Sequence, residues 1–196
     1  MQTNAVPVVA FYLVLLSWFC FAGIFTFRKK PPKAQKVKRA ILSKWGIALQ
    51  GVSYAAVWTL HRRPFTPLAP MPDWAEAVVA AVTVAIAIAS VWLCLVSVRT
   101  LGKQWAYQAR LIQGHELIEQ GPYSVVRNPI YLGMFGLLVS TGMAYSLWQA
   151  AVGAAVIFLI GNQIRIYSEE KLLREAFGPA FDEYTGRVPA FIPRLF

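Results

Sequence analysis

The stretch GHELIEQGPY occupies residues 114–123, and RNPIYLG follows at residues 127–133. These polar residues separate hydrophobic segments in a chain that is 57% hydrophobic and contains 9 acidic residues. A second polar cluster, formed by Arg165, Glu169 and Glu170, follows after two further hydrophobic segments. In so apolar a chain, ionisable side chains gathered at the ends of apolar helices are the first place to look for a functional site.

The composition around this stretch predicts a membrane protein. The mean hydropathy is +0.49 and only 14% of the residues are charged, which is too apolar for a soluble domain of this length. Runs of about 20 apolar residues can cross a hydrocarbon core of ~30 Å. We therefore expect an all-α integral membrane protein with five transmembrane helices. The expected helices cover residues 5–27, 40–60, 74–98, 129–145 and 148–164.

The basic residues predict the orientation of these helices. Eight of the 19 Lys and Arg residues lie in residues 28–44. With five spans, 17 basic residues fall on one side of the membrane and only Arg62 and Arg63 on the other. Because positively charged loops stay in the cytosol, we expect the N-terminus outside and the C-terminal region in the cytosol. Basic charge beside an apolar helix favours contact with anionic lipid headgroups, so no nucleic-acid partner is expected.

This plan divides the chain into two parts. Residues 1–98 hold three N-terminal transmembrane helices with the basic cytosolic loop 28–44. Residues 99–196 hold a core with a helical hairpin at 129–166, followed by a cytosolic C-terminal helix and tail.

Local signals mark the ends of several elements. Asn128 and Pro129 favour a helix start, because Asn is a good N-cap and Pro suits the first helical position. Gly178-Pro179 favours a stop after an amphipathic helix at 166–177. Residues 109–118 are compatible with a short β-hairpin. The tail at 181–196 is expected to fold back on the polar stretch.

Small residues predict which helix faces pack closely. Gly46, Gly51 and Ala55 share one face of the second expected helix. The third helix carries Ala81, Ala85 and Ala89 one turn apart, which favours helix packing over a ligand site.

The cysteines and histidines argue against a metal site. Cys20 and Cys94 both lie in apolar runs, and the chain has only two histidines, His61 and His115. No pair has metal-ligand spacing, so neither a disulfide framework nor a bound metal is expected.

Taken singly, the polar residues have plain structural explanations. Arg165 and Glu169 are four residues apart and could form a helical ion pair of only ~0.2–0.5 kcal/mol. Their combination with the earlier motif is more specific. The pattern is GHxLIxxGPYxxxRNPxYxG at 114–133, RxxxEExL at 165–172, FG at 177–178 and YxxxVP at 184–189.

This combination resembles the isoprenylcysteine carboxyl methyltransferase family, and phospholipid N-methyltransferases share parts of it. The similarity covers residues 101–193, about half of the chain. Residue 128 departs from the family, which usually has histidine where this chain has Asn128. An asparagine can hydrogen-bond but cannot titrate, which argues against an acid–base role at this position.

The resemblance implies a membrane enzyme that uses S-adenosylmethionine, yields S-adenosylhomocysteine, and has a cytosolic C-terminal cofactor-binding region. The soluble type of nucleotide site would need a G-x-G-x-x-G turn, which the chain lacks. Arg165 would bind the acceptor, and Arg165 and Glu169 would be the catalytic residues. The implied cofactor contacts are Gln108, His115, Glu116, Leu117, Ile118, Tyr123, Asn128, Tyr131 and Glu169.

Simple chemistry favours a carboxylate acceptor. A carboxylate is already ionised at neutral pH and needs no general base, and Arg165 can bind it through a planar two-donor fork. The expected acceptor is lipid-linked, such as a C-terminal prenylcysteine or a small analogue, and it enters from the bilayer.

Two other functions stay open. A phospholipid headgroup N-methyltransferase must deprotonate an ammonium, which a neighbouring arginine would oppose. A non-enzymatic membrane module or a nicotinamide-dependent reductase is the third possibility. The expected location is the plasma membrane in a prokaryote or the endoplasmic reticulum in a eukaryote.

Overall fold

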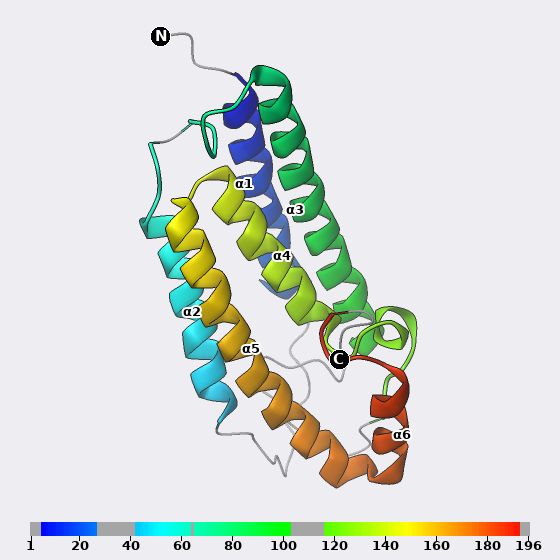
Figure 1. The fold of residues 1–196 in the computed structure, drawn as a ribbon. Coiled ribbons are helices and arrows are strands. Elements are labelled where there is room, and N and C mark those ends of the chain that lie inside the picture. The colour runs from blue at the N-terminus through cyan, green and yellow to red at the C-terminus, as the bar shows by residue number, and fades with distance from the viewer. Residues whose placement is uncertain (1–4, 27–41, 64, 103–115, 193–196) are drawn as a thin grey trace.

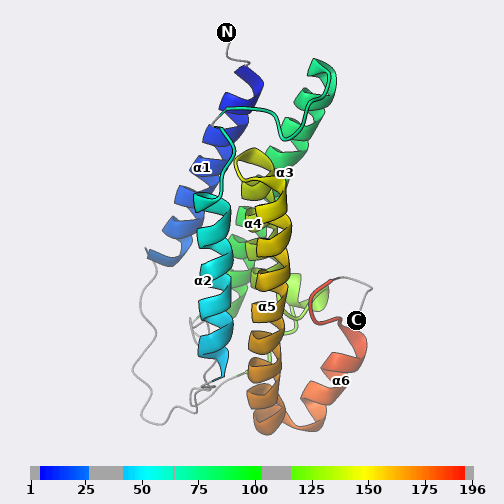
Figure 2. The same cartoon turned by 60° about the vertical axis from the view of Figure 1, so that its left-hand side comes forward.

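The protein is a bundle of long helices with a smaller helical region at one end (Figures 1 and 2). The computed structural model describes residues 5–26, 42–63, 65–102 and 116–192. Within these ranges the chain is helical and contains no strand. The elements are α1 (Ala5–Thr26), α2 (Ser43–Thr59), α3 (Asp73–Leu101), the 3-10 helix η2 (Gly121–Ser124), α4 (Pro129–Ala144), α5 (Trp148–Phe177) and α6 (Pro179–Arg187).

The pairing of helices explains how the bundle is held together. Helix α5 packs along α2, α4 packs along α3, and α1 lies against α3. Helices α4 and α5 form the predicted antiparallel hairpin. Figure 2 shows α6 beside the end of α5, away from the α4–α5 turn.

The all-α prediction is confirmed for the described residues, and helices occur at all five expected places. Helices α1, α3 and α5 are long and apolar enough to cross a membrane, whereas α4 is a shorter apolar helix. Helix α2 has 17 residues. The count of five membrane crossings stays a prediction. The possible hairpin at 109–118 lies mostly outside the described residues, and residues 116–118 are not in a strand.

Helix α5 is longer than a bilayer requires. Its 30 residues extend for about 45 Å at 1.5 Å per residue, so the expected span 148–164 and the amphipathic segment 166–177 form one continuous helix. Arg165 lies about 26 Å along this axis from Trp148. A helix that starts at one edge of a hydrocarbon core of ~30 Å therefore brings Arg165 close to the other edge.

The expected small-residue faces are only partly correct. Gly46 is buried, but Gly51 and Ala55 are exposed. The buried side of α2 instead carries Ser43, Gly46, Gln50, Ser53 and Val57.

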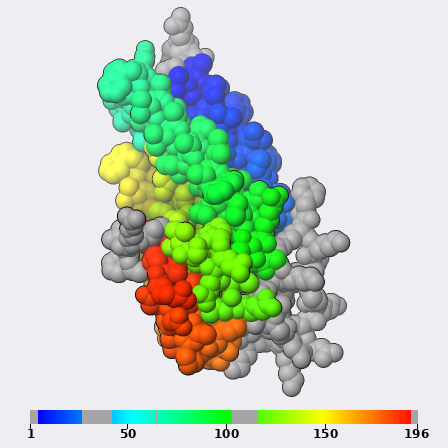
Figure 3. Space-filling view, turned by 90° about the vertical axis from the view of Figure 1, so that its right-hand side faces the viewer, coloured from blue at the N-terminus to red at the C-terminus, as the bar shows by residue number. Residues whose placement is uncertain are grey.

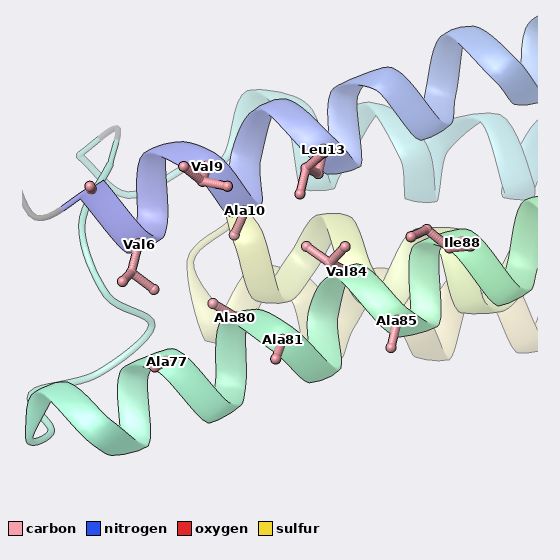
Figure 4. Close-up of a pocket in the computed structure, with 11 residues that line it drawn as sticks. Val6, Val9, Ala10, Leu13, Ala77, Ala80, Ala81, Val84, Ala85 and Ile88 are labelled. Atoms are coloured by element: carbon pink, nitrogen blue, oxygen red, sulfur yellow. The ribbon is translucent and has the colours of Figure 1, made fainter.

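Helix α3 shows the same error. Ala81, Ala85 and Ala89 are exposed, while the buried side carries Thr83, Ala87, Ser90 and Cys94. Ala81 and Ala85 line an open apolar groove of about 610 Å³ between α1 and α3 (Figure 4). Alanine can face lipid at no cost, whereas hydroxyl and amide groups need partners inside the bundle, and this difference selects the polar faces for burial.

An arginine secures the turn between α4 and α5. Arg62 donates from Nη1 to the carbonyl oxygen of Ser146 at 2.7 Å and from Nη2 to that of Met143, also at 2.7 Å. The Leu147 amide donates to the Leu60 carbonyl oxygen at 3.0 Å. The bond to Met143 satisfies a carbonyl in the last turn of α4 that has no helical partner. Together the three bonds attach the loop after α2 to the hairpin.

The close approach of α2 to α5 generates a stability prediction. A Cβ at Gly46 would lie 2.4 Å from Arg165 Cγ and 2.5 Å from the Gly161 carbonyl oxygen, whereas a Cβ at Gly51 meets nothing within 4 Å. Gly46→Ala should lower the free energy of unfolding by about 1–3 kcal/mol through overpacking. Gly51→Ala is the matched control and should be neutral or slightly stabilising. Thermal unfolding in detergent tests this, and equal melting temperatures for the two variants would contradict the described packing.

Candidate active site

A buried arginine lies where three helices meet. Arg165 on α5 is 8% exposed, and its Nη1 donates to Gln50 Oε1 on α2 at 2.9 Å. Its Nη2 lies 3.5 Å from Glu169 Oε1, one turn further along α5. Its Cζ lies 4.5 Å from the centroid of the Tyr131 ring on α4. The guanidinium is therefore held by an amide, a carboxylate and an aromatic face at once.

Glu169 connects this arginine to α4. The Tyr131 hydroxyl donates to Glu169 Oε1, the same oxygen that faces Arg165. The Tyr131 residue is buried, whereas the Glu169 side chain is 22% exposed. The Arg165–Glu169 ion pair that the four-residue spacing allows is present, but it belongs to a buried cluster rather than to a solvated helix face.

Gln50 is the member of this cluster that sequence reasoning missed. A usable signal was present, because Gln50 lies in an apolar helix four residues after Gly46 and three before Ser53. This spacing puts the three residues on one helix face. A lone amide in a membrane helix is expected to face the bundle interior and find a partner there.

The start of α4 is fastened to the C-terminal tail. Helix α4 begins at Pro129 as predicted, but the side chain of Asn128 does not cap it. Instead Asn128 Nδ2 donates to the carbonyl oxygen of Ala190 at 2.8 Å. The Arg127 amide donates to the Pro189 carbonyl oxygen at 2.9 Å. The tail therefore folds back onto the polar stretch, as predicted.

Arg127 strengthens this contact through its side chain. Its Nη2 lies 2.8 Å from Glu170 Oε1 on α5. Its Nη1 also donates to the carbonyl oxygens of Thr185 and Val188. Arg127 belongs to the sequence motif, and the motif alone does not indicate its role. Its contacts show that it joins the start of α4, the end of α5 and the tail.

The segment before α4 packs on α6. Tyr123 in η2 is buried, and its carbonyl oxygen accepts a hydrogen bond from the Tyr184 hydroxyl at 2.6 Å. Burial raises the pKa of Tyr184 to about 12, so this phenol stays protonated and remains a donor at physiological pH. Leu117 packs against Phe181, Tyr184 and Val188. Figure 3 shows the red tail and α6 lying directly against the light green segment.

The remaining predicted site residues divide into two groups. Gln108 and His115 lie outside the described residues. Glu116 is exposed and Ile118 is half-buried, and both lie in the segment leading to η2. Among the described ranges, no group of three or more His, Cys, Asp or Glu residues could hold a metal ion.

Comparison with known proteins agrees with these motifs. A family model described as phospholipid methyltransferase matches residues 78–180, more than half of the 196-residue chain. The chain is 39% identical over 113 residues to the nickel-cobalt-cadmium resistance protein NccN of Alcaligenes xylosoxydans xylosoxydans, covering 56% of this chain and 51% of that protein. It is 39% identical over 104 residues to the cobalt-zinc-cadmium resistance protein CzcN of Cupriavidus metallidurans, covering 51% and 46%.

A plant relative carries an enzyme name. The chain is 30% identical over 96 residues to protein-S-isoprenylcysteine O-methyltransferase B of Arabidopsis thaliana, covering 48% of this chain and 49% of that protein. The chain spans about half the length of the curated relatives it matches. The resemblance to isoprenylcysteine carboxyl methyltransferases is thus confirmed, and the chain belongs to the phospholipid methyltransferase family.

Proposed function

We propose that this chain is a membrane methyltransferase that transfers a methyl group from S-adenosylmethionine to the carboxylate of a lipid-linked acceptor. The observation that carries the proposal is the buried Arg165 guanidinium, held against Tyr131 and Glu169 near one edge of the expected membrane span. Family membership supports methyl transfer, and the arginine supports an anionic acceptor.

The residues around Glu169 suit the methyl donor. S-adenosylmethionine carries a positively charged sulfonium and an ammonium group, and Glu169 offers a negatively charged partner on a side chain that is 22% exposed. Tyr131 donates to that carboxylate and so holds it in place. Residues 116–118 and Tyr123 would form the other side of the cofactor site, together with the predicted contacts Gln108, His115 and Asn128. When bound, the cofactor supplies an electrophilic methyl group and leaves as S-adenosylhomocysteine.

The acceptor would be held by the other end of the same cluster. Arg165 provides a permanent positive charge with planar donors, which match the two oxygens of a carboxylate. Methyl transfer is an in-line displacement, so these side chains have to align the reactants and exclude water. The position of Arg165 along α5 lets a lipid tail remain in the bilayer while its carboxylate reaches the site. A prenylated C-terminal cysteine or a small analogue fits this description.

An amine acceptor is the second candidate, because the family model is described as phospholipid methyltransferase. A headgroup ammonium would have to lose a proton before attack. The buried Arg165 cation opposes binding of that ammonium, so we favour the carboxylate.

We also propose that the site faces the cytosol, on the basis of the 17-to-2 distribution of basic residues. Single cysteines at Thr66 and Thr185, in a chain without Cys20 and Cys94, should react with an impermeant reagent from opposite sides. Reaction of both from the same side would contradict this orientation.

Glu169→Gln tests the proposed cofactor contact. The change is nearly isosteric and removes the charge that would meet a cation, so affinity for S-adenosylmethionine should fall about tenfold or more. Glu183→Gln is the control, because Glu183 is 75% exposed on α6. Calorimetry on both purified variants measures the effect. Unchanged affinity in a folded Glu169→Gln protein would leave this residue with a structural role only.

Arg165→Lys tests the nature of the acceptor. A lysine ammonium cannot reproduce the planar fork, so turnover of a carboxylate acceptor should fall at least about tenfold while cofactor affinity changes little. Arg174→Lys is the matched control, since Arg174 is 52% exposed on the same helix. Asn128→His should be tolerated, because an imidazole N–H can also donate to the Ala190 carbonyl oxygen. Full activity of Arg165→Lys with a base-stable product would favour the amine acceptor instead.

A further inference from the structure

Helix α2 contributes a side chain to the cluster although it precedes the region that matches the family model, residues 78–180. Gln50 is 2% exposed, and its Oε1 accepts a hydrogen bond from Arg165 Nη1 at 2.9 Å. The two residues are 115 positions apart in sequence. The packing of α2 on α5 therefore brings a buried amide to the proposed acceptor site.

The backbone of α2 holds this amide at a fixed place. A Cβ at Gly161 would lie 2.8 Å from the Gly46 carbonyl oxygen and 2.9 Å from Leu49 Cβ. A Cβ at Gly46 would collide with the aliphatic stem of Arg165. These two glycines let the helices touch directly beside Arg165. Gln50 lies one turn beyond Gly46, so the close contact between the two helix backbones fixes the distance from the Gln50 backbone to Arg165.

The neutral charge of Gln50 affects what Arg165 can bind. The carboxylate of Glu169 lies 3.5 Å from Arg165 Nη2, longer than the ~2.7–2.9 Å of a strong charge-assisted hydrogen bond. An amide on the other side orients the guanidinium but adds no negative charge. A glutamate there would neutralise it. A neutral residue 50 therefore does not compete with an anionic acceptor for the Arg165 guanidinium.

Gln50 also has unused hydrogen-bonding capacity. Its Nε2 is buried and has no hydrogen-bond partner within the part of the chain that the structure describes. Buried donors normally find partners, so an unmatched one beside a guanidinium is consistent with a ligand that supplies acceptor oxygens. A carboxylate has that chemistry.

We propose that Gln50 is a positioning residue of the acceptor site, orienting the Arg165 guanidinium toward the acceptor carboxylate without neutralising it. This inference rests on the proposed carboxyl methyltransferase function. It extends the site to α2 and makes residue 50 a determinant of affinity for anionic acceptors.

Gln50→Glu and Gln50→Leu test this inference in the full chain, reconstituted in lipid nanodiscs. The probe is the lipid carboxylate that the wild type methylates best, with an N-acetylated S-prenylcysteine tried first. Gln50→Glu keeps an acceptor for Nη1 but adds a negative charge, so the acceptor KM should rise at least about tenfold. Gln50→Leu removes the hydrogen bond to Arg165 Nη1 and should raise this KM by a smaller factor. Affinity for S-adenosylmethionine should stay within about twofold of the wild type in both variants.

The controls separate positioning from packing. Gln163→Leu is the matched control, because Gln163 is an exposed amide on α5, two residues from Arg165. If Gln50 served packing alone, its variants would have a lower melting temperature, and cofactor affinity and acceptor KM would change together. The rise in acceptor KM would then not be larger for Gln50→Glu than for Gln50→Leu. An acceptor KM within twofold of the wild type for Gln50→Glu would overturn the inference. Because that variant keeps the shape and the hydrogen-bond acceptor, it decides the matter if Gln50→Leu does not fold.

The wild-type measurement distinguishes this inference from the proposed function. If the wild type esterifies no lipid carboxylate, the proposed function fails and the inference fails with it. If the wild type is active and the Gln50 variants keep its acceptor KM, only the inference fails.

Discussion

Burial of one guanidinium group organises the functional end of this protein. A charge inside an apolar bundle is tolerated only with partners, and Arg165 has them on three helices, in Gln50, Tyr131 and Glu169. Removing any of these helices would leave the charge under-compensated. The contacts of Arg165 therefore serve two purposes. They hold α2, α4 and α5 together, and they form the proposed site. Methyl transfer requires such preorganisation, because the reaction gains most from alignment of the reactants.

The length of α5 and the return of the tail place this cluster at a boundary. The helix carries its apolar half through the expected membrane and its charged half beyond it. Arg127 then binds Glu170 and the tail carbonyls, which brings the tail back to the start of α4. The proposed site thus lies where an acceptor from the bilayer and a cofactor from the water phase can meet. Such a site can take one reactant from each phase.

The sequence predicted the elements well because their signals are local. Long apolar runs, Pro129 and Gly178-Pro179 located the helices, and the four-residue spacing allowed the Arg165–Glu169 pair. Buried faces were harder to predict, since alanine and glycine have little energetic preference between contact with lipid and contact with another helix. The contact of Gln50 with Arg165 depends on tertiary packing, and so does that of Asn128 with the tail. The role expected for Tyr131 came from family resemblance alone.

The central claim is that this site esterifies a carboxylate next to a buried arginine. The most direct test incubates the purified protein with methyl-labelled S-adenosylmethionine and a panel of lipid carboxylates and phospholipids, followed by treatment with base. A methyl ester releases volatile labelled methanol, whereas an N-methyl group does not. The proposed function predicts base-labile label on a lipid carboxylate. Base-stable label on a phospholipid headgroup, with none on any carboxylate, would contradict it.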